Sequence, residues 1–207
     1  MRKYYSRPAP QYQLYFTARR PISSMQFPAS EFPPHEKSIT MSFYDATVPA
    51  FLQILGALSG ILGKAEAHCQ AKNIQQEVLL SARLYPDMFP LTRQIQTACD
   101  FAAKGCARLT GSEVPSTPDT EKSFADLQAR IAKTVEYVKA FKPAQFEGAD
   151  ARDVTFPAGP NNQLTLKGQQ FLSAFAFPNF YFHAAIAHAI LRHNGVELGK
   201  RDFLGVK

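Results

Sequence analysis

The stretch SFYDATVPAFLQILGALSGIL, residues 42–62, decides the fold class of this chain. Ser42 followed three residues later by Asp45 is the pattern of a capping box at a helix N-terminus. Large apolar residues then recur at the spacing of one helix face, namely Val48, Phe51, Leu52, Leu55, Leu58 and Leu62. The pattern predicts a long helix that begins at Ser42, is buried along one side, and ends near Lys72.

Two further helices are predicted in the middle of the chain. One covers residues 90–109 and stops at Gly111, a residue suited to a left-handed helix cap. The next follows a polar, proline-containing linker at residues 112–120 and carries an apolar stripe over residues 124–138. We predict that the charged residues of this region form a solvated face, namely Glu121, Lys122, Arg130, Lys133 and Lys139.

The C-terminal part combines a hairpin with a last helix. RDVTF at 152–156 and QLTLK at 163–167 alternate in polarity on either side of the turn-forming PAGPNN, which predicts a short β-hairpin. The last helix is predicted from Gly168 to Gly195, and we expect a kink at Pro178, because an internal proline removes a backbone hydrogen bond. The fold class is therefore all-α: a four-helix bundle with a short hairpin before the last helix.

The net charge is concentrated ahead of the predicted bundle. Of the formal charge of +6, residues 1–40 contribute +4 and residues 41–207 only +2. We therefore divide the chain into a basic leader, 1–40, which is expected to be disordered, and one helical domain, 41–207. Because binding to a nucleic-acid duplex needs clustered phosphate contacts, the nearly neutral domain is not expected to bind nucleic acid.

Three observations concern the cellular compartment. The first 24 residues hold five basic and no acidic side chains, as mitochondrial presequences do, but three prolines break any amphipathic helix there. Cys69, Cys99 and Cys106 fall in predicted helices, where buried packing in a reducing compartment is expected. We find no run of about 18 apolar residues, and therefore expect no membrane span. A cytoplasmic location is expected, with mitochondria as the alternative.

Three histidines lie at five-residue intervals in FPNFYFHAAIAHAILRHNG, residues 177–195. Each interval rotates a helical side chain by a net angle of about 140°. His183, His188 and His193 therefore point in three different directions and are not expected to ligate one ion together.

His183 is the histidine best placed to take part in a site. The large apolar residues predict a buried face that contains Phe175, Phe182, Ile186 and Ile190. His193 falls near the centre of this face and His183 at its edge, one turn after Asn179. In an antiparallel bundle, Asp87 and Gln94, which flank the start of the 90–109 helix, could reach His183.

Two interpretations of His183 remain open. In the favoured one, Asn179, Gln94 or a carboxylate satisfies its ring nitrogens by hydrogen bonding, as buried polar groups require. In the other, His183 ligates a divalent metal such as zinc or nickel, together with Asp87 and His193. Amide side chains are poor ligands for these metals, so Asn179 would not belong to such a site.

Three segments resemble a known family: MSFYDATVPAFLQILGALSGILGKAEAH, ARLYPDMFPLTRQIQTACDFAA and FPNFYFHAAIAHAILRHNGVELGKRDFLG. They are similar to an uncharacterised domain-of-unknown-function family of the DinB/YfiT-like superfamily of metalloenzymes. The resemblance covers residues 41–205. It implies an up-down four-helix bundle with a long crossover connection, often dimeric. In better-known members, one histidine from the second helix and a His-x-x-x-His pair on the last helix hold a divalent metal.

The sequence departs from that metal-binding pattern at two places. Ala187 stands four residues after His183, and residues 90–109 contain no histidine. We therefore expect no metal cofactor, and predict a DinB-like bundle whose aromatic pocket around Phe175, Phe182 and His183 binds a small molecule or stabilises a homodimer. The alternatives are a metal-dependent thiol transferase or isomerase and a helix-turn-helix-like nucleic-acid-binding protein.

Overall fold

The first helix begins and ends at the residues that local signals indicate. The structure is a computed structural model, which describes residues 41–157, 159 and 162–206, so the predictions for the leader 1–40 lie outside the described residues. Helix α1 spans Phe43–Lys72. The Ser42 hydroxyl caps it by accepting a hydrogen bond from the Asp45 amide at 3.1 Å. Asn73 closes the other end in the left-handed conformation, with φ of 53°.

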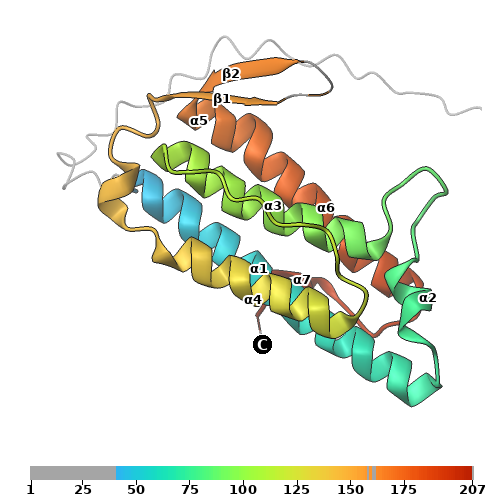
Figure 1. Ribbon diagram of the computed structural model, residues 1–207. Helices are drawn as coiled ribbons and strands as arrows, with labels where there is room; N and C mark the ends of the chain where they lie inside the picture. Colours follow the sequence, from blue (N-terminus) through green and yellow to red (C-terminus); the bar gives the residue numbers. More distant parts are fainter. Residues whose placement is uncertain (1–40, 158, 160–161, 207) are drawn as a thin grey trace, which may run out of the picture. The chain divides into compact units, whose positions relative to one another are not determined.

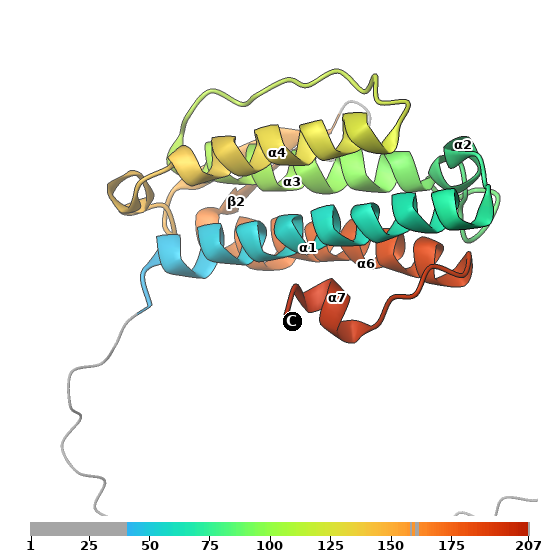
Figure 2. The same ribbon diagram turned by 90° about the horizontal axis from the view of Figure 1, so that it is seen from below.

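Four long helices form the bundle, as predicted (Figure 1). They are α1, α3 (Leu91–Thr110), α4 (Phe124–Ala140) and α6 (Phe177–His193). Helix α3 packs against α6 and α4, and α4 packs against α1. The connection after α3 runs back along the whole bundle before α4 begins, so α3 and α4 are parallel to each other and antiparallel to α1 and α6 (Figure 2).

Short elements lie at the ends and along one side of the bundle (Figure 2). Helix α2 (Gln76–Leu80) lies between α1 and α3, and the 3₁₀ turn η1 (Pro143–Phe146) follows α4. Strands β1 (Asp153–Pro157) and β2 (Gln163–Lys167) form the predicted antiparallel hairpin, in which Thr155 pairs with Thr165. Helix α7 (Lys200–Leu204) packs on α1.

The last bundle helix changes its winding without breaking. Helix α5 (Gly168–Gln170), the π-helical segment η2 (Phe171–Ala176) and α6 follow one another directly. The irregularity expected at Pro178 therefore lies just before it. A π-helical turn accommodates a residue that has no amide proton, and it rotates every later side chain relative to a regular α-helix.

This change of winding explains an error in the predicted face of α6. The buried residues are Phe180, His183, Ala184, Ala187, Ile190 and Leu191. Phe182, which was predicted to be buried, is 52% exposed, and His193 is exposed rather than central. The prediction continued a regular spacing from Phe175 across a segment that is not a regular α-helix.

Small side chains bring α3 and α6 close together. Ala98 and Ala102 on α3 and Ala184 and Ala187 on α6 are fully buried. The three cysteines are free and buried, as expected from their positions in the helices. Burial raises the pKa of the Cys99 and Cys106 thiols to about 12, so both remain protonated packing residues at neutral pH.

Arg130 on α4 is not part of a solvated face, contrary to the prediction. Its side chain is 3% exposed and pairs with Asp100 at 2.7 Å, Glu121 at 2.9 Å and Asp119 at 3.2 Å. It also donates to the carbonyl oxygen of Pro118 at 3.2 Å. Because Asp119 and Glu121 belong to the crossover connection, Arg130 fastens that connection to the α3–α4 groove.

Two helical segments are long and apolar enough to cross a membrane by length and composition alone, Phe43–Lys72 and Gly168–His193. This corrects the expectation that the sequence contains no such segment. Buried core helices of soluble proteins meet the same criteria, so the observation is weak support for a membrane span. Both segments contribute residues to the core of the bundle.

Candidate functional site

His183 occupies an aromatic cage between α3 and α6. The ring lies nearly parallel to Phe89 and Phe101, with centroid distances of 6.2 and 5.9 Å and an interplanar angle of 16° in both cases. Phe182 meets it edge-on at 5.2 Å. Phe89 precedes α3 and Phe101 lies on that helix, so both of these rings come from the neighbouring part of the bundle.

A hydrogen bond to Gln94 fixes the tautomer of His183. Gln94 Oε1 lies 2.7 Å from His183 Nδ1, and Gln94 Nε2 donates to the Phe89 carbonyl oxygen at 3.0 Å. The second bond orients the amide so that its oxygen faces the histidine. Because that oxygen can only accept, Nδ1 carries the proton and Nε2 presents a lone pair. The predicted contact between Gln94 and His183 is confirmed.

The Nε2 atom of His183 retains contact with solvent. Among the described residues, Arg130 Nε is the only fully buried side-chain nitrogen or oxygen without a hydrogen-bond partner. His183 Nε2 also has no hydrogen-bond partner among the described residues. Since it is not one of the fully buried atoms without a partner, it must be partly exposed to solvent. The cage therefore leaves one acceptor open at the edge of the ring.

Burial lowers the pKa of His183 to about 4, and the positive charge of Arg93 adds to the effect. Arg93 lies over the Phe89 ring, 5.6 Å from its centroid, and forms an ion pair with Asp119. The imidazole is therefore neutral at physiological pH. A neutral, oriented imidazole with an open Nε2 can accept a hydrogen bond.

The other predicted site residues lie elsewhere. Phe175 packs against Phe101 at 5.8 Å and against Phe156 at 4.3 Å, so it reaches His183 only through the shared neighbour Phe101. The amide of Asn179 donates to the Phe175 carbonyl oxygen at 2.8 Å instead of contacting His183. Asp87 is exposed, and among the described residues no hydrogen bond or ion pair joins it to His183.

The remaining histidines of the last helix do not converge on His183. His188 Nε2 lies 3.1 Å from the Gly199 carbonyl oxygen, and its ring meets Phe203 edge-on. His193 is exposed in the last turn of α6. Their divergence agrees with the rotation expected from five-residue spacing.

Three residues of the cage were not predicted: Phe89, Phe101 and Arg93. One signal was available for Phe101, because it lies seven residues after Gln94 and therefore on the same face of α3. Phe89 belongs to an irregular connection, and its position follows from the path of that connection rather than from any periodicity.

A divalent metal does not fit this arrangement. The described residues contain no group of three or more His, Cys, Asp or Glu side chains placed to hold a metal ion. Around His183 the neighbouring polar groups are the amide of Gln94, a poor ligand, and the guanidinium of Arg93, which repels a cation. Ala187, one turn after His183, is fully buried and offers no ligand atom.

The bundle topology and the position of His183 between α3 and α6 define a DinB-like helical bundle. A crystal structure of a DinB family member from Shewanella denitrificans is similar, with a TM-score of 0.73 and 43% identity, over 79% of this chain and 92% of that one. Residues 43–204 match the family described as a domain of unknown function, DUF1993, and the chain belongs to that family. No curated protein matches it.

Proposed function

We propose that this DinB-like protein binds a small, mainly apolar molecule at His183 and does so without a three-histidine metal centre. The ligand donates one hydrogen bond to Nε2 and packs its apolar part against the exposed sides of Phe89 and Phe182. The observation that carries this proposal is the hydrogen bond between Gln94 and His183, because it leaves Nε2 as an open acceptor.

The exposure of the cage residues supports a binding role. Phe89 is 48% exposed and Phe182 is 52% exposed, although both contact a buried imidazole. Ligand sites commonly combine apolar walls with a few oriented polar groups. Here one acceptor, two partly exposed aromatic rings and the Arg93 guanidinium lie within one short stretch of surface.

Phenol and anisole distinguish this role from nonspecific aromatic binding. The two probes have similar shape, but only phenol can donate to Nε2. We expect phenol to bind roughly threefold to tenfold more tightly, as one neutral hydrogen bond allows. Titration followed by amide resonances of α3 and α6 measures both affinities. Equal affinities would contradict the proposal.

Two variants test the residues. Phe182→Ala removes a surface ring and should weaken phenol binding while leaving the fold intact. His183→Ala should abolish the preference for phenol over anisole. His193→Ala, an exposed position on the same helix, is the matched control and should change neither affinity.

A second function, homodimerisation, is favoured by the same surface. Leu84 and Tyr85, from the connection that leads to Phe89, are 37% and 66% exposed. A second copy covering these residues and Phe182 would remove apolar area from water. Sedimentation of the protein and of Phe182→Glu tests this: a dimer that the variant converts to a monomer supports it, and a monomer in both cases rejects it.

Other activities have less support. A metal-dependent transferase using His183, Asp87 and His193 would need these side chains to converge. Asp87 and His193 are exposed, and within the described part of the chain no hydrogen bond or ion pair joins either to His183. Nucleic-acid binding remains unfavoured because the domain is nearly neutral. The cytoplasmic location stays a prediction based on reduced cysteines, and the mitochondrial alternative depends on residues 1–40, outside the described part.

A further inference from the structure

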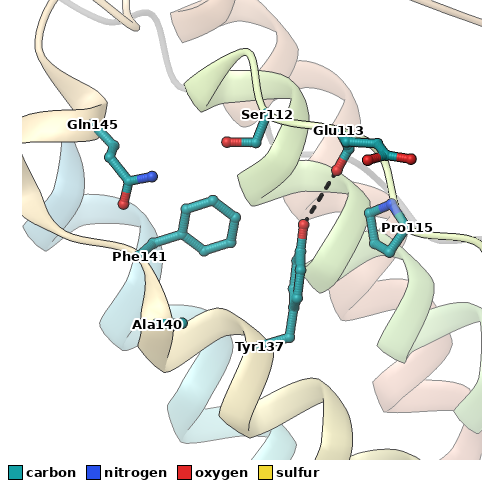
Figure 3. Close-up of a pocket in the computed structure, with 7 residues that line it drawn as sticks. All are labelled: Ser112, Glu113, Pro115, Tyr137, Ala140, Phe141 and Gln145. Carbon is teal, nitrogen blue, oxygen red and sulfur yellow. Dashed lines mark hydrogen bonds between the residues drawn. The ribbon is translucent and has the colours of Figure 1, made fainter.

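A cavity lies far from His183, where α3 and α4 both end. Its volume is about 410 Å³, within the range of small-molecule sites. Figure 3 shows the side chains around it, contributed by the crossover, the last turn of α4 and η1: Ser112, Glu113, Pro115, Tyr137, Ala140, Phe141 and Gln145. Gln94 and Ser112 are about 27 Å apart along the helix direction, so the two sites are separate.

Two aromatic rings form a braced wall of this cavity. Tyr137 and Phe141 pack edge to face, with centroids 5.3 Å apart and planes at 84°. Phe141 is buried and also meets Phe146 at 6.2 Å. Pro115 lies on the crossover beside Tyr137, on the side away from Phe141 (Figure 3). The wall is therefore apolar and held in place by packing, as an organic ligand requires.

Hydrogen bonds within the protein leave two hydroxyl acceptors at the cavity. The Tyr137 hydroxyl donates to the Glu113 carbonyl oxygen at 3.3 Å, so its lone pairs stay available. The Thr110 hydroxyl donates to the Cys106 carbonyl oxygen at 2.9 Å. In the 2.8 Å contact between Ser112 and Thr110, Ser112 is then the donor, and its oxygen remains an acceptor.

Gln145 supplies the available donor. Its Oε1 accepts a hydrogen bond from the Lys142 amide at 2.7 Å, which leaves Nε2 free to donate. Figure 3 shows this nitrogen on the side of the amide that faces the cavity. The polar inventory is therefore two hydroxyl acceptors and one amide donor.

The electrostatic character of the cavity comes from two parallel helices. The negative ends of the α3 and α4 dipoles both lie here. At α3, Gly111 caps the helix and the Arg152 guanidinium already donates to the Leu109 carbonyl oxygen at 2.7 Å, whereas the extended residue after α4, Phe141, donates no capping hydrogen bond. Glu113 adds an exposed carboxylate at the rim, turned away from the cavity in Figure 3. Lys139, close by, pairs with Glu136 at 3.5 Å.

We propose that this cavity binds a small organic cation, a primary ammonium group attached to an aromatic or aliphatic body. The ammonium group donates to Ser112 Oγ and Tyr137 Oη and is favoured by the C-terminal end of α4, while the body packs on Tyr137 and Phe141. Cations are attracted to aromatic faces, so the wall contributes to recognition of the charge as well as the apolar body. The site is independent of the function proposed for His183.

Phenylethylammonium and 3-phenylpropionate are suitable probes, because they have similar bodies and opposite charges. Titration of the full chain, followed by amide resonances, should show binding of the cation with shifts at residues 112, 137 and 145. The anion should bind at least about tenfold more weakly, because helix C-termini disfavour negative charge. Equal binding of both probes, or no binding of the cation at millimolar concentration, would overturn the proposal.

Substitutions locate the cation. Ala140→Phe fills the cavity at an exposed position and should abolish binding, whereas Ala125→Phe, an exposed position on the same helix, should not. Tyr137→Phe keeps the ring but loses one acceptor, and should weaken binding roughly threefold to tenfold. Unchanged affinity in both Ala140→Phe and Tyr137→Phe would refute this location. His183→Ala should leave cation binding unchanged, which separates this result from the test of the His183 site.

Discussion

Helix α3 contacts a buried polar residue on each of its two packed sides, and the two residues are stabilised in different ways. Towards α4, Arg130 is charged and is surrounded by three carboxylates and a backbone carbonyl. Towards α6, His183 is neutral and has one hydrogen-bond partner, Gln94. In the first arrangement, Arg130 Nη1 donates to the crossover connection and Nη2 to Asp100 on α3, and among the described residues only Nε has no partner, whereas the second arrangement leaves an acceptor open beside exposed aromatic rings.

This difference separates a structural role from a candidate binding role. A buried charge needs compensation by paired groups, and Arg130 has it from both α3 and the crossover. A neutral imidazole needs less compensation than a buried charge, so His183 can remain buried while one ring nitrogen has no hydrogen bond within the protein. The comparison predicts that substitutions on the Arg130 side mainly change stability, and that those on the His183 side change the properties of the imidazole.

The largest effect is expected for Arg130→Met. It leaves Asp100, Asp119 and Glu121 without their shared partner and releases the crossover. We expect the free energy of unfolding to fall by about 3 kcal/mol, as for other broken buried ion pairs. Urea denaturation measures this value. The control is Lys133→Met, an exposed position on the same helix. A loss below about 1 kcal/mol for Arg130→Met would contradict a structural role for the Arg130 side of α3.

A pH-dependent loss of stability is expected next, from His183. Its pKa is about 4 in the folded protein against 6.5 as the ordinary value, so the unfolded chain binds the proton more readily. The contribution of neutral His183 is present in full above pH 6.5 and is lost as the pH falls towards 4, up to about 3 kcal/mol.

The pH effect can be isolated by difference. Hydrogen bonds and neighbouring charges also lower the pKa values of Asp126, Glu121 and Asp202. Protonation of these carboxylates therefore destabilises the protein in acid as well. We therefore compare urea denaturation of the protein with that of His183→Gln between pH 4 and pH 7. The difference between the two slopes of unfolding free energy against pH is the contribution of His183. Parallel curves would show that the pKa of His183 is not lowered.

Gln94→Leu should have an intermediate effect. It keeps the side-chain volume but removes the acceptor for Nδ1, leaving a buried N–H without a partner. The expected loss is about 1–2 kcal/mol of unfolding free energy. The same variant should yield a mixture of both imidazole tautomers by NMR. Gln70→Leu, at an exposed position on α1, is the control. A single Nδ1-protonated tautomer in Gln94→Leu would show that Gln94 does not determine the tautomer of His183.

The smallest effect on stability is expected for Phe182→Ala. Its ring is half exposed and contributes mainly to the edge of the cage, so the loss should stay below about 0.5 kcal/mol. A much larger loss in urea denaturation would place Phe182 among the structural residues and weaken the case for a binding surface there.

Local signals were sufficient to predict the four long helices. Ser42 predicted the start of α1, and Gly111, in the left-handed conformation with φ of 70°, predicted the end of α3. The hairpin followed from alternating polarity around a turn. These features depend on neighbouring residues only, which is why a single sequence contains them.

The site was predicted only in part, because it depends on contacts between distant residues. Gln94 and His183 are 89 positions apart, and their pairing was foreseen because antiparallel helices bring those ends together. The burial of Arg130 was not foreseen, since it depends on where the crossover places Asp119 and Glu121. The orientation of Phe182 was missed because a π-helical segment precedes it, and no residue pattern specifies that segment.

The most direct test of the account is a long-range ¹H–¹⁵N spectrum of the histidine side chains at pH 7, recorded before and after addition of one equivalent of zinc. The account predicts that His183 is neutral, protonated at Nδ1 and unprotonated at Nε2, and that zinc leaves both of its nitrogen shifts unchanged. A protonated ring, the opposite tautomer, or a stoichiometric change of the Nε2 shift with zinc would contradict it.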